Sequence, residues 1–483
     1  MTQHPSELTE IIEMVTGMFY YVKAQGDKAR EFNICAGDVV GDTDETERAL
    51  HQRLMEIGSK LMSEYFEQVG NGDEGYHAKF NGREYVRQHS DRPGSILTVF
   101  GPVEFRQCIY YDGSGESVRP FEAMANLPER NVTYFAQELM TRLGIEDTYA
   151  SSQSFYADFF GHSPSSRTIE QVIQETATTY QAYDNAHVPM PEDPAGRIGV
   201  VSFDGKGVPV ISSERTTGKT REALLGCTYV IEPEQRDAER LADSLVVPEI
   251  LSEEEKKELH RESRAENIRY HASVAMPKDT LFKEVRDEAE VRFATANVIM
   301  VVCLMDGALK LWELAKKHFP NAVYILDLMH VLGYLRAAAT ALTKTPDAAQ
   351  LLLAAYLRSI LQGEVHGVIK SMRIRMAKNK FNKQQVDAIQ AAITYFENHA
   401  DYMRYDEYIK AGCPIATGVI ESACKHIAKD RMSKAGAQWS ITGAEAVLKL
   451  RCMRATGHWH EYHEIRREDE RKELYHSHLR AVA

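Results

Sequence analysis

The stretch IGVVSFDGKGVPVI, residues 198–211, decides the fold, because it alternates as an apolar β-strand, a turn at Asp204-Gly205 and a second strand. The segments that follow it alternate between strand and helix patterns. They are a third strand in LLGCTYVIEP (224–233), a charged helix-prone stretch (249–271), a strand in VIMVVCLMDGA (298–308), a helix (309–319) and a strand in AVYILDLMHV (322–331). Three strands followed by helix-separated strands predict an α/β core.

Two aspartates stand at the ends of apolar strands in this core. Asp204 closes VVSFD and Asp306 closes VVCLMD. Strand ends in open α/β sheets are where ligands bind, although Asp-Gly is also an ordinary turn dipeptide. A third carboxylate, Glu421, lies in CPIATGVIESACKHIAKD, where a helix would present Glu421, Lys425 and Ala428 along one stripe. A Glu-Lys surface pair is the alternative for that stripe.

Three converging carboxylates suit a site for two divalent ions, because such ions need hard oxygen ligands that bridge and flank them. Asp327 and His330, in ILDLMH, follow the next strand. Asp327 could cap the following helix and His330 could be a structural histidine. Beside a metal site, the same two side chains could instead support its ligands or a phosphate.

The first part of the chain reads as helix to about residue 75 and then as a β-hairpin, in which SILTVF and the residues after Gly101-Pro102 alternate. Residues 149–176 carry a helix-turn-helix pattern, with Phe155 and Phe159 expected to face the second helix across a turn at Gly161 and with Ser165 or Ser166 as its N-cap. An ordinary helical hairpin is the alternative. The outward residues of the second helix that could contact DNA are Arg167, Thr168, Gln171 and Gln174.

Charge is unevenly distributed along the chain. The 483 residues carry 57 Lys and Arg against 70 Asp and Glu, a net charge of −13, so a nucleic-acid surface must be local. Residues 365–454 hold 15 basic against 8 acidic residues. The candidate phosphate contacts in this segment are Arg373, Arg375, Lys378, Lys380, Lys425, Lys429 and Arg431. A solvated helix face is the alternative. Trp439 could stack on a base or lie beneath the glutamate helix.

The composition, 43% hydrophobic and 26% charged, is globular. Apolar runs are shorter than a membrane helix needs, and the N-terminus lacks a signal-peptide pattern, so we expect a cytoplasmic protein. The seven cysteines contain no CxxC pair. Scattered cysteines of this kind predict reduced thiols and no zinc site. The histidines of HWHEYH, residues 458–463, are expected at the surface.

Three blocks together resemble a bacterial insertion-sequence DDE transposase of the ISKra family, related to Mutator-like transposases. They are VVSFDGKGVPV (200–210), MDGALKLWELAKKHFPNAVYILDLMHVLGYL (305–335) and IATGVIESACKHIAKDRMSKAGAQWSITGAEAVLKLR (415–451). The second block contains the aspartate-x-x-histidine signature of such transposases, here Asp327 and His330. The resemblance implies that Asp204, Asp306 and Glu421 are the catalytic and metal-binding triad of a ribonuclease-H-like domain. It departs from the family after Cys108, where similar proteins often continue into paired cysteines.

The resemblance implies cleavage of transposon ends and strand transfer into target DNA by in-line displacement, with two Mg²⁺ or Mn²⁺ ions. The expected partners are transposon-end and target DNA and a second copy of the chain, in a homodimer or higher homo-oligomer, with nucleoid association when DNA is bound. The expected divisions are a helical region at 1–90, a small β-hairpin module at 91–128, a helix-turn-helix DNA-binding region at 129–185, the first part of the core at 196–331, a helical insertion at 332–412, the second part of the core at 413–460 and a charged tail at 461–483.

Two other readings stay open. A nuclease on the same scaffold would cut DNA without joining it. A transposase-derived DNA-binding protein would use only the helix-turn-helix, but such a protein has no need to bring three repelling carboxylates together.

Overall fold

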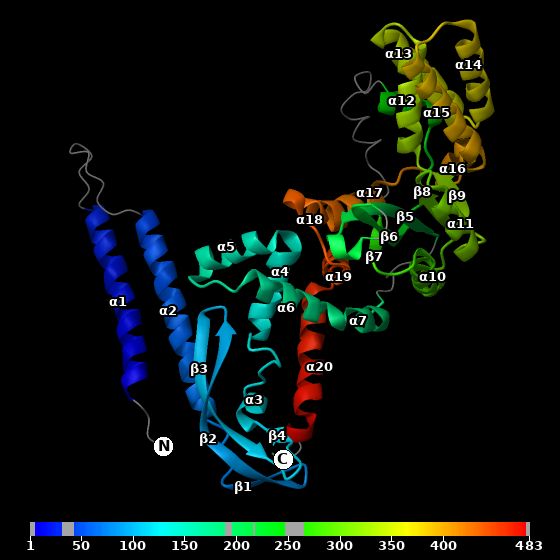
Figure 1. Ribbon diagram of the computed structural model, residues 1–483. Coiled ribbons are helices and arrows are strands. Elements are labelled where there is room, and N and C mark those ends of the chain that lie inside the picture. Colours follow the sequence, from blue (N-terminus) through cyan, green and yellow to red (C-terminus); the bar gives the residue numbers. More distant parts are fainter. Residues whose placement is uncertain (1–4, 31–42, 189–195, 216–217, 247–264, 480–483) are drawn as a thin grey trace. The chain divides into compact units, whose positions relative to one another are not determined.

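The computed structural model describes residues 5–30, 43–188, 196–215, 218–246 and 265–479. The chain divides into two compact units, residues 1–179 with 459–483 and residues 180–458 (Figure 1). The expected mixed α/β character is confirmed. Among the described residues, no helix combines the length and the apolarity that crossing a bilayer requires.

A five-stranded mixed sheet in the order β7-β6-β5-β8-β9 forms the centre of the second unit. Its strands are β5 (Ile198–Pro209), β6 (Thr220–Ile231), β7 (Glu266–Ser273), β8 (Met300–Met305) and β9 (Val323–Leu326). β5, β6 and β7 pair antiparallel, whereas β8 pairs parallel with β5 and β9 parallel with β8. The apolar strands bury both faces, as their near-continuous hydrophobic sequences require.

The strands differ from the prediction in two places. Asp204 lies inside β5 and not at its end, because β5 continues to pair with β6 as far as Pro209. The predicted turn and second strand of residues 198–211 are therefore one long strand. The stretch 249–271 is predicted to be helical, but its last residues, from Glu266 onward, belong to the strand β7. Residues 249–264 lie outside the described part.

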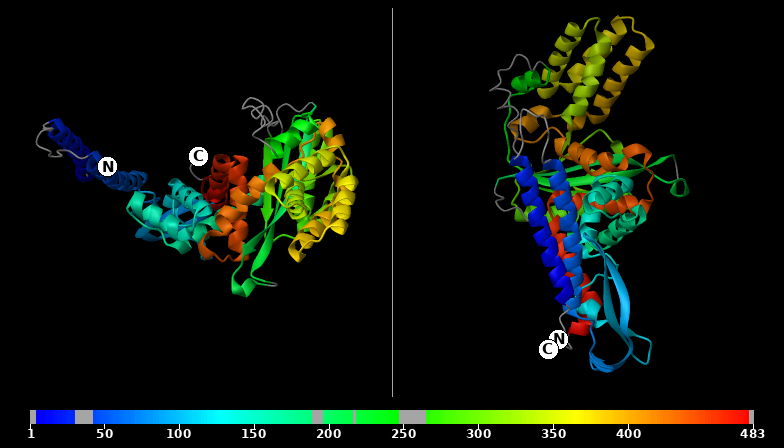
Figure 2. Two further views of the ribbon diagram at one scale, coloured as in Figure 1. Left: turned by 90° about the horizontal axis from the view of Figure 1, so that it is seen from above. Right: turned by 90° about the vertical axis from the view of Figure 1, so that its left-hand side faces the viewer.

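The second unit also contains helices that accompany the sheet. They are α7 (Tyr180–Ala186), α8 (Ala238–Val246), α10 (Lys278–Thr295), α11 (Leu309–His318), α12 (Leu328–Leu342), α13 (Pro346–Leu361), α14 (Val365–Lys378), α15 (Lys383–His399), α16 (Tyr405–Lys410), α17 (Gly418–Ala423), α18 (Asp430–Met432) and α19 (Ile441–Thr456). Helices α12 to α15 pack together as a bundle (Figures 1 and 2). The predicted helical insertion began at residue 332, whereas the first helix of the bundle begins at Leu328.

The bundle is tied to the sheet by side chains that follow it. The Tyr405 hydroxyl donates to the carbonyl oxygen of Leu326 at 2.7 Å, and the Tyr408 hydroxyl donates to that of Tyr324 at 2.9 Å. Both acceptors belong to β9. These bonds satisfy buried backbone oxygens at the sheet's edge and fix the insertion against it.

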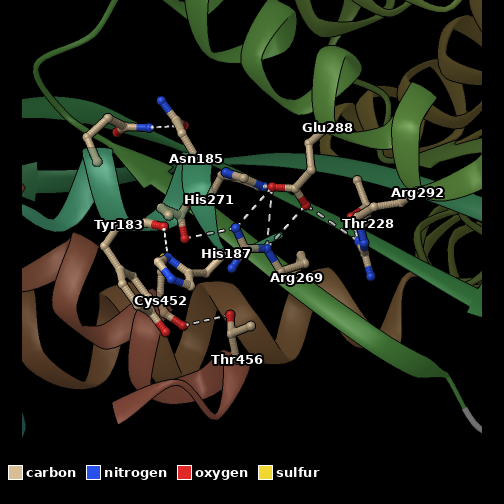
Figure 3. A network of polar contacts seen from close by, with 12 residues as sticks. Tyr183, Asn185, His187, Thr228, Arg269, His271, Glu288, Arg292, Cys452 and Thr456 are labelled. Atoms are coloured by element: carbon tan, nitrogen blue, oxygen red, sulfur yellow. Dashed lines mark hydrogen bonds and ion pairs between the residues drawn. The ribbon is translucent and has the colours of Figure 1, made fainter. Parts of the chain in front are cut away.

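A buried network of charges joins α7, β7 and α10 (Figure 3). Arg269, with no exposed surface, lies 2.8 Å from Asp184 and 3.1 Å from Glu288. Burial alone would raise the pKa of Glu288, but His271 and Arg269 outweigh it and hold that pKa well below its usual range. Arg292 donates to the Thr228 hydroxyl. Because each buried charge has an opposite partner, this network is structural.

The first unit contains a second, four-stranded sheet. Its elements are α1 (Pro5–Arg30), α2 (Thr43–Val69), β1 (His77–Phe80), β2 (Arg83–Thr98), β3 (Gly101–Tyr111), β4 (Ser117–Val118), α3 (Pro120–Met124), α4 (Tyr134–Glu146), α5 (Tyr149–Phe160), α6 (Ser166–Thr178) and α20 (Trp459–Leu479). The predicted hairpin is confirmed as the antiparallel pair β2–β3. The boundary at residue 90 is wrong, because β1 begins at His77 and the sheet includes residues that were assigned to the helical region.

The expected helix pair α5–α6 is present, with Gly161 left-handed at its turn and the Ser165 side chain capping α6. The prediction that Phe155 and Phe159 face α6 is wrong, however. Tyr156 is fully buried, whereas Phe155 and Phe159 are 38% and 50% exposed and stack on each other. Tyr156 lies on the other side of α5, so the helix is rotated from the predicted orientation.

The prediction of a charged tail at residues 461–483 also needs correction, because most of that segment forms the helix α20, which is part of the first unit. Tyr462 donates its hydroxyl to the carbonyl oxygen of Thr176, and Tyr475 donates to that of Leu127 at 2.6 Å. The three histidines of HWHEYH differ in their exposure. His460 is exposed as predicted, but His458 and His463 are half-buried. Burial lowers the pKa of His463 to about 3, so this ring is neutral at pH 7.

Candidate active site

Asp204, in β5, and Asp306, directly after β8, follow the last pair of these two parallel strands by the same number of residues. The last pair between β5 and β8 is Val201 with Cys303, and the same register, continued by three residues, places Asp204 beside Asp306. Residues level on adjacent strands point to the same face of a sheet. The two carboxylates are therefore expected on one face, and the charge of Asp204, which acts on the pKa of Asp306, indicates that they are near each other.

Asp327 extends this row by one strand. The last pair between β8 and β9 is Met305 with Leu326, so the next residues, Asp306 and Asp327, are level. The amide of Asp327 donates to the carbonyl oxygen of Met305 at 2.9 Å and continues the ladder to this point. Asp204 within β5, Asp306 directly after β8 and Asp327 directly after β9 thus come from three neighbouring strands of the sheet.

Asp306 is held by its own loop and by the helical insertion. Its carboxylate accepts the Ala308 amide at 3.1 Å, and its carbonyl oxygen accepts the indole N–H of Trp312 at 2.8 Å. The ring of Tyr395, from α15, packs so closely on Gly307 that a Cβ there would lie 2.3 Å from the ring. Glycine is therefore required after Asp306 because an aromatic ring covers the backbone.

Asp327 has no exposed surface, and both of its oxygens accept hydrogen bonds. Oδ1 accepts the Thr417 amide at 2.9 Å, and Oδ2 accepts the His330 amide at 3.0 Å as the N-cap of α12. Nδ1 of His330 donates to the same Oδ2 at 2.6 Å. With three of its roughly four lone pairs used by protein donors, Asp327 holds the Thr417 backbone and the His330 ring in place.

Glu421 reaches the same place from α17. Its Oε1 lies 3.9 Å from Nδ1 of His330, and its side chain is 50% exposed. The predicted stripe of Glu421, Lys425 and Ala428 is wrong. A π-helical segment at Cys424–Lys429 follows α17, and it exposes Lys425 while burying Ala428 completely. Single-turn π segments insert one extra residue per turn and change the face that the later residues present.

The negative charges of the neighbouring carboxylates contribute to raised pKa values of Asp306 and Glu421. Burial raises the pKa of Asp306, the Ala308 amide partly opposes that rise, and the charge of Asp204 adds to it. Burial also raises the pKa of Glu421, and Asp327, Asp204 and Asp306 raise it further against the opposing effect of His330. Asp204, Asp306 and Glu421 are therefore close enough to interact, and a bound cation would relieve their repulsion.

His330 has the opposite response. Its hydrogen bond to Asp327 is the main cause that raises its pKa, burial opposes the rise, and the charges of Asp306 and Glu421 support it. Because Nδ1 is engaged by Asp327, Nε2 is the nitrogen available for a further partner.

The donor set of Asp204, Asp306 and Glu421 fits Mg²⁺ or Mn²⁺, because these ions take carboxylate oxygens and keep part of their water. Ligand atoms of Asp327, His330 and Glu421 also lie within 4.8 Å of one another. We favour the first set, since the oxygens of Asp327 are already occupied by protein donors.

A second cluster, Asp184, His271 and Glu288, brings ligand atoms equally close. The guanidinium of Arg269 already lies between its carboxylates, 2.8 Å from Asp184 and 3.1 Å from Glu288. A fixed positive charge in that position disfavours a metal ion. All six described cysteines are buried and free; Cys35 lies outside the described residues.

The predicted DNA contacts on α14 and in the π segment are mostly at the surface. Arg375, Lys378, Lys380, Lys425 and Lys429 are exposed, and Arg373, also exposed, pairs with Glu397 at 2.6 Å. Arg431 is 2% exposed, with its guanidinium 4.5 Å from the Trp439 ring centroid. Arg431 is therefore a core cation and leaves the set of DNA contacts. Trp439 is buried, as the structural alternative for it predicted.

The four candidates on α6 belong to the first unit. Arg167 is exposed, while Thr168, Gln171 and Gln174 are half-buried. The Thr168 hydroxyl lies 2.8 Å from that of Ser165 within the helix cap, and Gln174 donates to Glu170 at 3.3 Å. Of these four side chains, Arg167 is the best presented for a phosphate.

Two further residues at the site were missed by the sequence interpretation. Cys424 lies near Asp204, and burial together with that neighbouring charge raises the pKa of its thiol. Its position three residues after Glu421 on one helix was the available signal. Tyr395 gave no comparable signal, because only tertiary packing brings α15 onto Gly307.

No protein-family model matches this chain, and no curated protein matches it either.

Proposed function

We propose that the chain is a metal-dependent DNA transposase with a ribonuclease-H-like catalytic unit at residues 180–458. The observation that carries the proposal is the grouping of Asp204 in β5, Asp306 directly after β8 and Glu421 in α17, which are close enough for their charges to interact. A sheet of three antiparallel strands followed by two parallel ones, in the order β7-β6-β5-β8-β9, supports it. That arrangement matches the core that the resemblance implies.

In this proposal, Asp204, Asp306 and Glu421 hold two Mg²⁺ or Mn²⁺ ions. Bound there, the ions would activate water or a 3′-hydroxyl and stabilise the leaving oxygen. Asp327 fixes the Nδ1 side of His330 and the backbone before α17, so it keeps Glu421 directed at the two aspartates. The exposed Arg375, Lys378, Lys425 and Lys429 would neutralise phosphates along the DNA.

Cleavage and strand transfer on labelled DNA that carries the flanking element ends test this function. Isosteric Asp204→Asn, Asp306→Asn and Glu421→Gln variants are expected to lose both reactions while binding the ends. Asp401→Asn, an exposed carboxylate of the same chain outside this cluster, is the matched control and should keep them. Retention of cleavage by the three site variants would reject the proposal.

The same assay separates the alternatives. A nuclease would give cleaved ends without joined products. A DNA-binding protein would bind the ends without cutting them in either metal, and its binding would depend on residues 129–185. Nucleoid association and a homo-oligomer on DNA belong to the transposase proposal and have no separate support.

A further inference from the structure

An open groove adjoins Glu421 on the side of α12. It has a volume of about 380 Å³ and is lined by Met329, His330, Gly333, Tyr334, Ala337 and Glu421. Its size lies in the range of small-molecule sites, about 300–1,000 Å³. Glu421 is one of the three proposed metal-binding carboxylates and His330 lies beside it, so the groove begins at the edge of the candidate active site.

The remainder of the groove is apolar and aromatic. Met329, Gly333 and Ala337 recur every four residues, and they form one stripe along the exposed side of α12. Met329 is 45% exposed. A Cβ built on Gly333 meets nothing within 4 Å, so the space above the stripe is open.

Tyr334 supplies an ordered aromatic ring beside this stripe. It stacks on Tyr395 with ring centroids 4.0 Å apart and planes inclined by 18°. Because Tyr395 is itself packed on Gly307, the pair connects the groove to the loop of Asp306. A half-buried ring held from behind offers contact area at little cost in side-chain entropy.

We propose that this groove binds a nucleobase, namely the unstacked base of the nucleotide next to the phosphodiester held at Asp204, Asp306 and Glu421. The inference rests on the proposed function and specifies a subsite for it. A phosphate at the carboxylates carries its base with it through one sugar, and the groove starts at one of those carboxylates, Glu421, and continues along α12. Aromatic rings and thioethers both bind flat π-systems favourably.

The charge at the site favours a base over a protein segment. A protein side chain could fill the groove, but it would bring no phosphate to balance the positive charge of the metal ions proposed at the carboxylates. A nucleotide satisfies both ends, because its phosphate is anionic and its base is flat and largely apolar. The base must leave its stack, which is easiest at strand ends and in single strands.

The probe for a test is a mixed-sequence single-stranded oligonucleotide, labelled at one end, in Ca²⁺ to prevent cleavage. A single abasic site is moved along it, and the affinity of the full chain is measured by fluorescence anisotropy. One position should be sensitive, with about tenfold weaker binding when its base is removed, which is the scale of one stacked base.

Gly333→Leu places an apolar side chain in the groove, where a Cβ meets nothing within 4 Å, and leucine favours the helix over glycine. This variant should bind the intact oligonucleotide about tenfold more weakly and lose its sensitivity to the abasic site. The matched control is Gly367→Leu, at an exposed glycine of α14, which should behave as the wild type. Ala337→Leu fills the groove one turn further along and covers the case in which Gly333→Leu fails to fold.

Equal sensitivity to base removal in the wild type and in the filled variants would overturn the inference, as would the absence of any sensitive position. Neither result bears on cleavage by the wild type and its loss in Asp204→Asn. The proposed function therefore stands or fails independently of this subsite.

Discussion

The buried carboxylate of Asp327 accepts the backbone amide hydrogen of Thr417 at 2.9 Å, although the whole helical insertion separates the two residues in the chain. The bond joins the end of β9 to the residue before α17. Beside it, the Leu328 amide donates to the carbonyl oxygen of Ile415 at 2.9 Å. Glu421 is therefore positioned from the sheet, and the insertion can leave and return without displacing it.

Replacing Asp327 with asparagine should destabilise the second unit. One of its two oxygens becomes an N–H₂ group that faces either the Thr417 amide or the His330 donors. An unpaired buried donor costs about 1–3 kcal/mol of the free energy of unfolding. Urea unfolding measures this loss. Asp347→Asn, at the exposed start of α13, serves as the control and should stay within about 0.5 kcal/mol of the wild type.

Stability should also depend on pH through Asp306 and Glu421. Both have pKa values raised in the folded state, from unfolded values of 3.8 and 4.5. Such acids bind protons more tightly when folded, so the free energy of unfolding falls as pH rises from those values through the folded ones. Without metal, Asp306→Asn and Glu421→Gln should each be more stable than the wild type at pH 7 and should lose that advantage near pH 4.

Thermal unfolding across pH, in EDTA and in Mg²⁺, measures this dependence. Mg²⁺ should raise the melting temperature of the wild type by binding the folded state, and the two variants should respond less. If both variants follow the pH profile of the wild type in EDTA, repulsion within the carboxylate cluster is not the cause of the slope.

A methyl group at position 307 should disturb the loop of Asp306. The Cβ of Gly307→Ala would lie 2.3 Å from the ring of Tyr395, closer than packed atoms approach. We expect overpacking to cost about 1–3 kcal/mol in urea unfolding. Combining it with Tyr395→Leu should recover part of the loss, because the narrower side chain vacates the contact. A double variant no better than the sum of the single changes would show that the strain lies elsewhere.

The extent to which sequence predicts this site differs from residue to residue. Asp306 and Asp327 directly follow short apolar strands, so the ends of these apolar runs located them. Asp204 was found as well, but its place inside β5 was not, because pairing with β6 overrides the Asp-Gly turn signal. Glu421 was a candidate on its predicted helix, with a Glu-Lys surface pair as the alternative, and the resemblance assigned it to the triad. The π segment after it, the ring of Tyr395 on Gly307 and the return of α20 to the first unit depend on contacts between distant parts of the chain, which periodicity does not encode.

Two basic residues two positions apart should have different effects. Arg431 is buried against Trp439, so Arg431→Ala removes a desolvated cation–π contact and should cost about 2 kcal/mol or more in urea unfolding. Lys429 is exposed, so Lys429→Ala should leave stability within about 0.5 kcal/mol of the wild type.

DNA affinity should show the reverse pattern. If Lys429 contacts a phosphate, Lys429→Ala should lower the slope of log affinity against log salt by about 1, uniformly across sequences. Arg431→Ala, measured at a temperature where it is folded, should keep the slope of the wild type, because a buried guanidinium releases no counterion. A lowered slope for Arg431→Ala together with an unchanged slope for Lys429→Ala would mean that DNA binding rearranges the π segment and exposes the core cation.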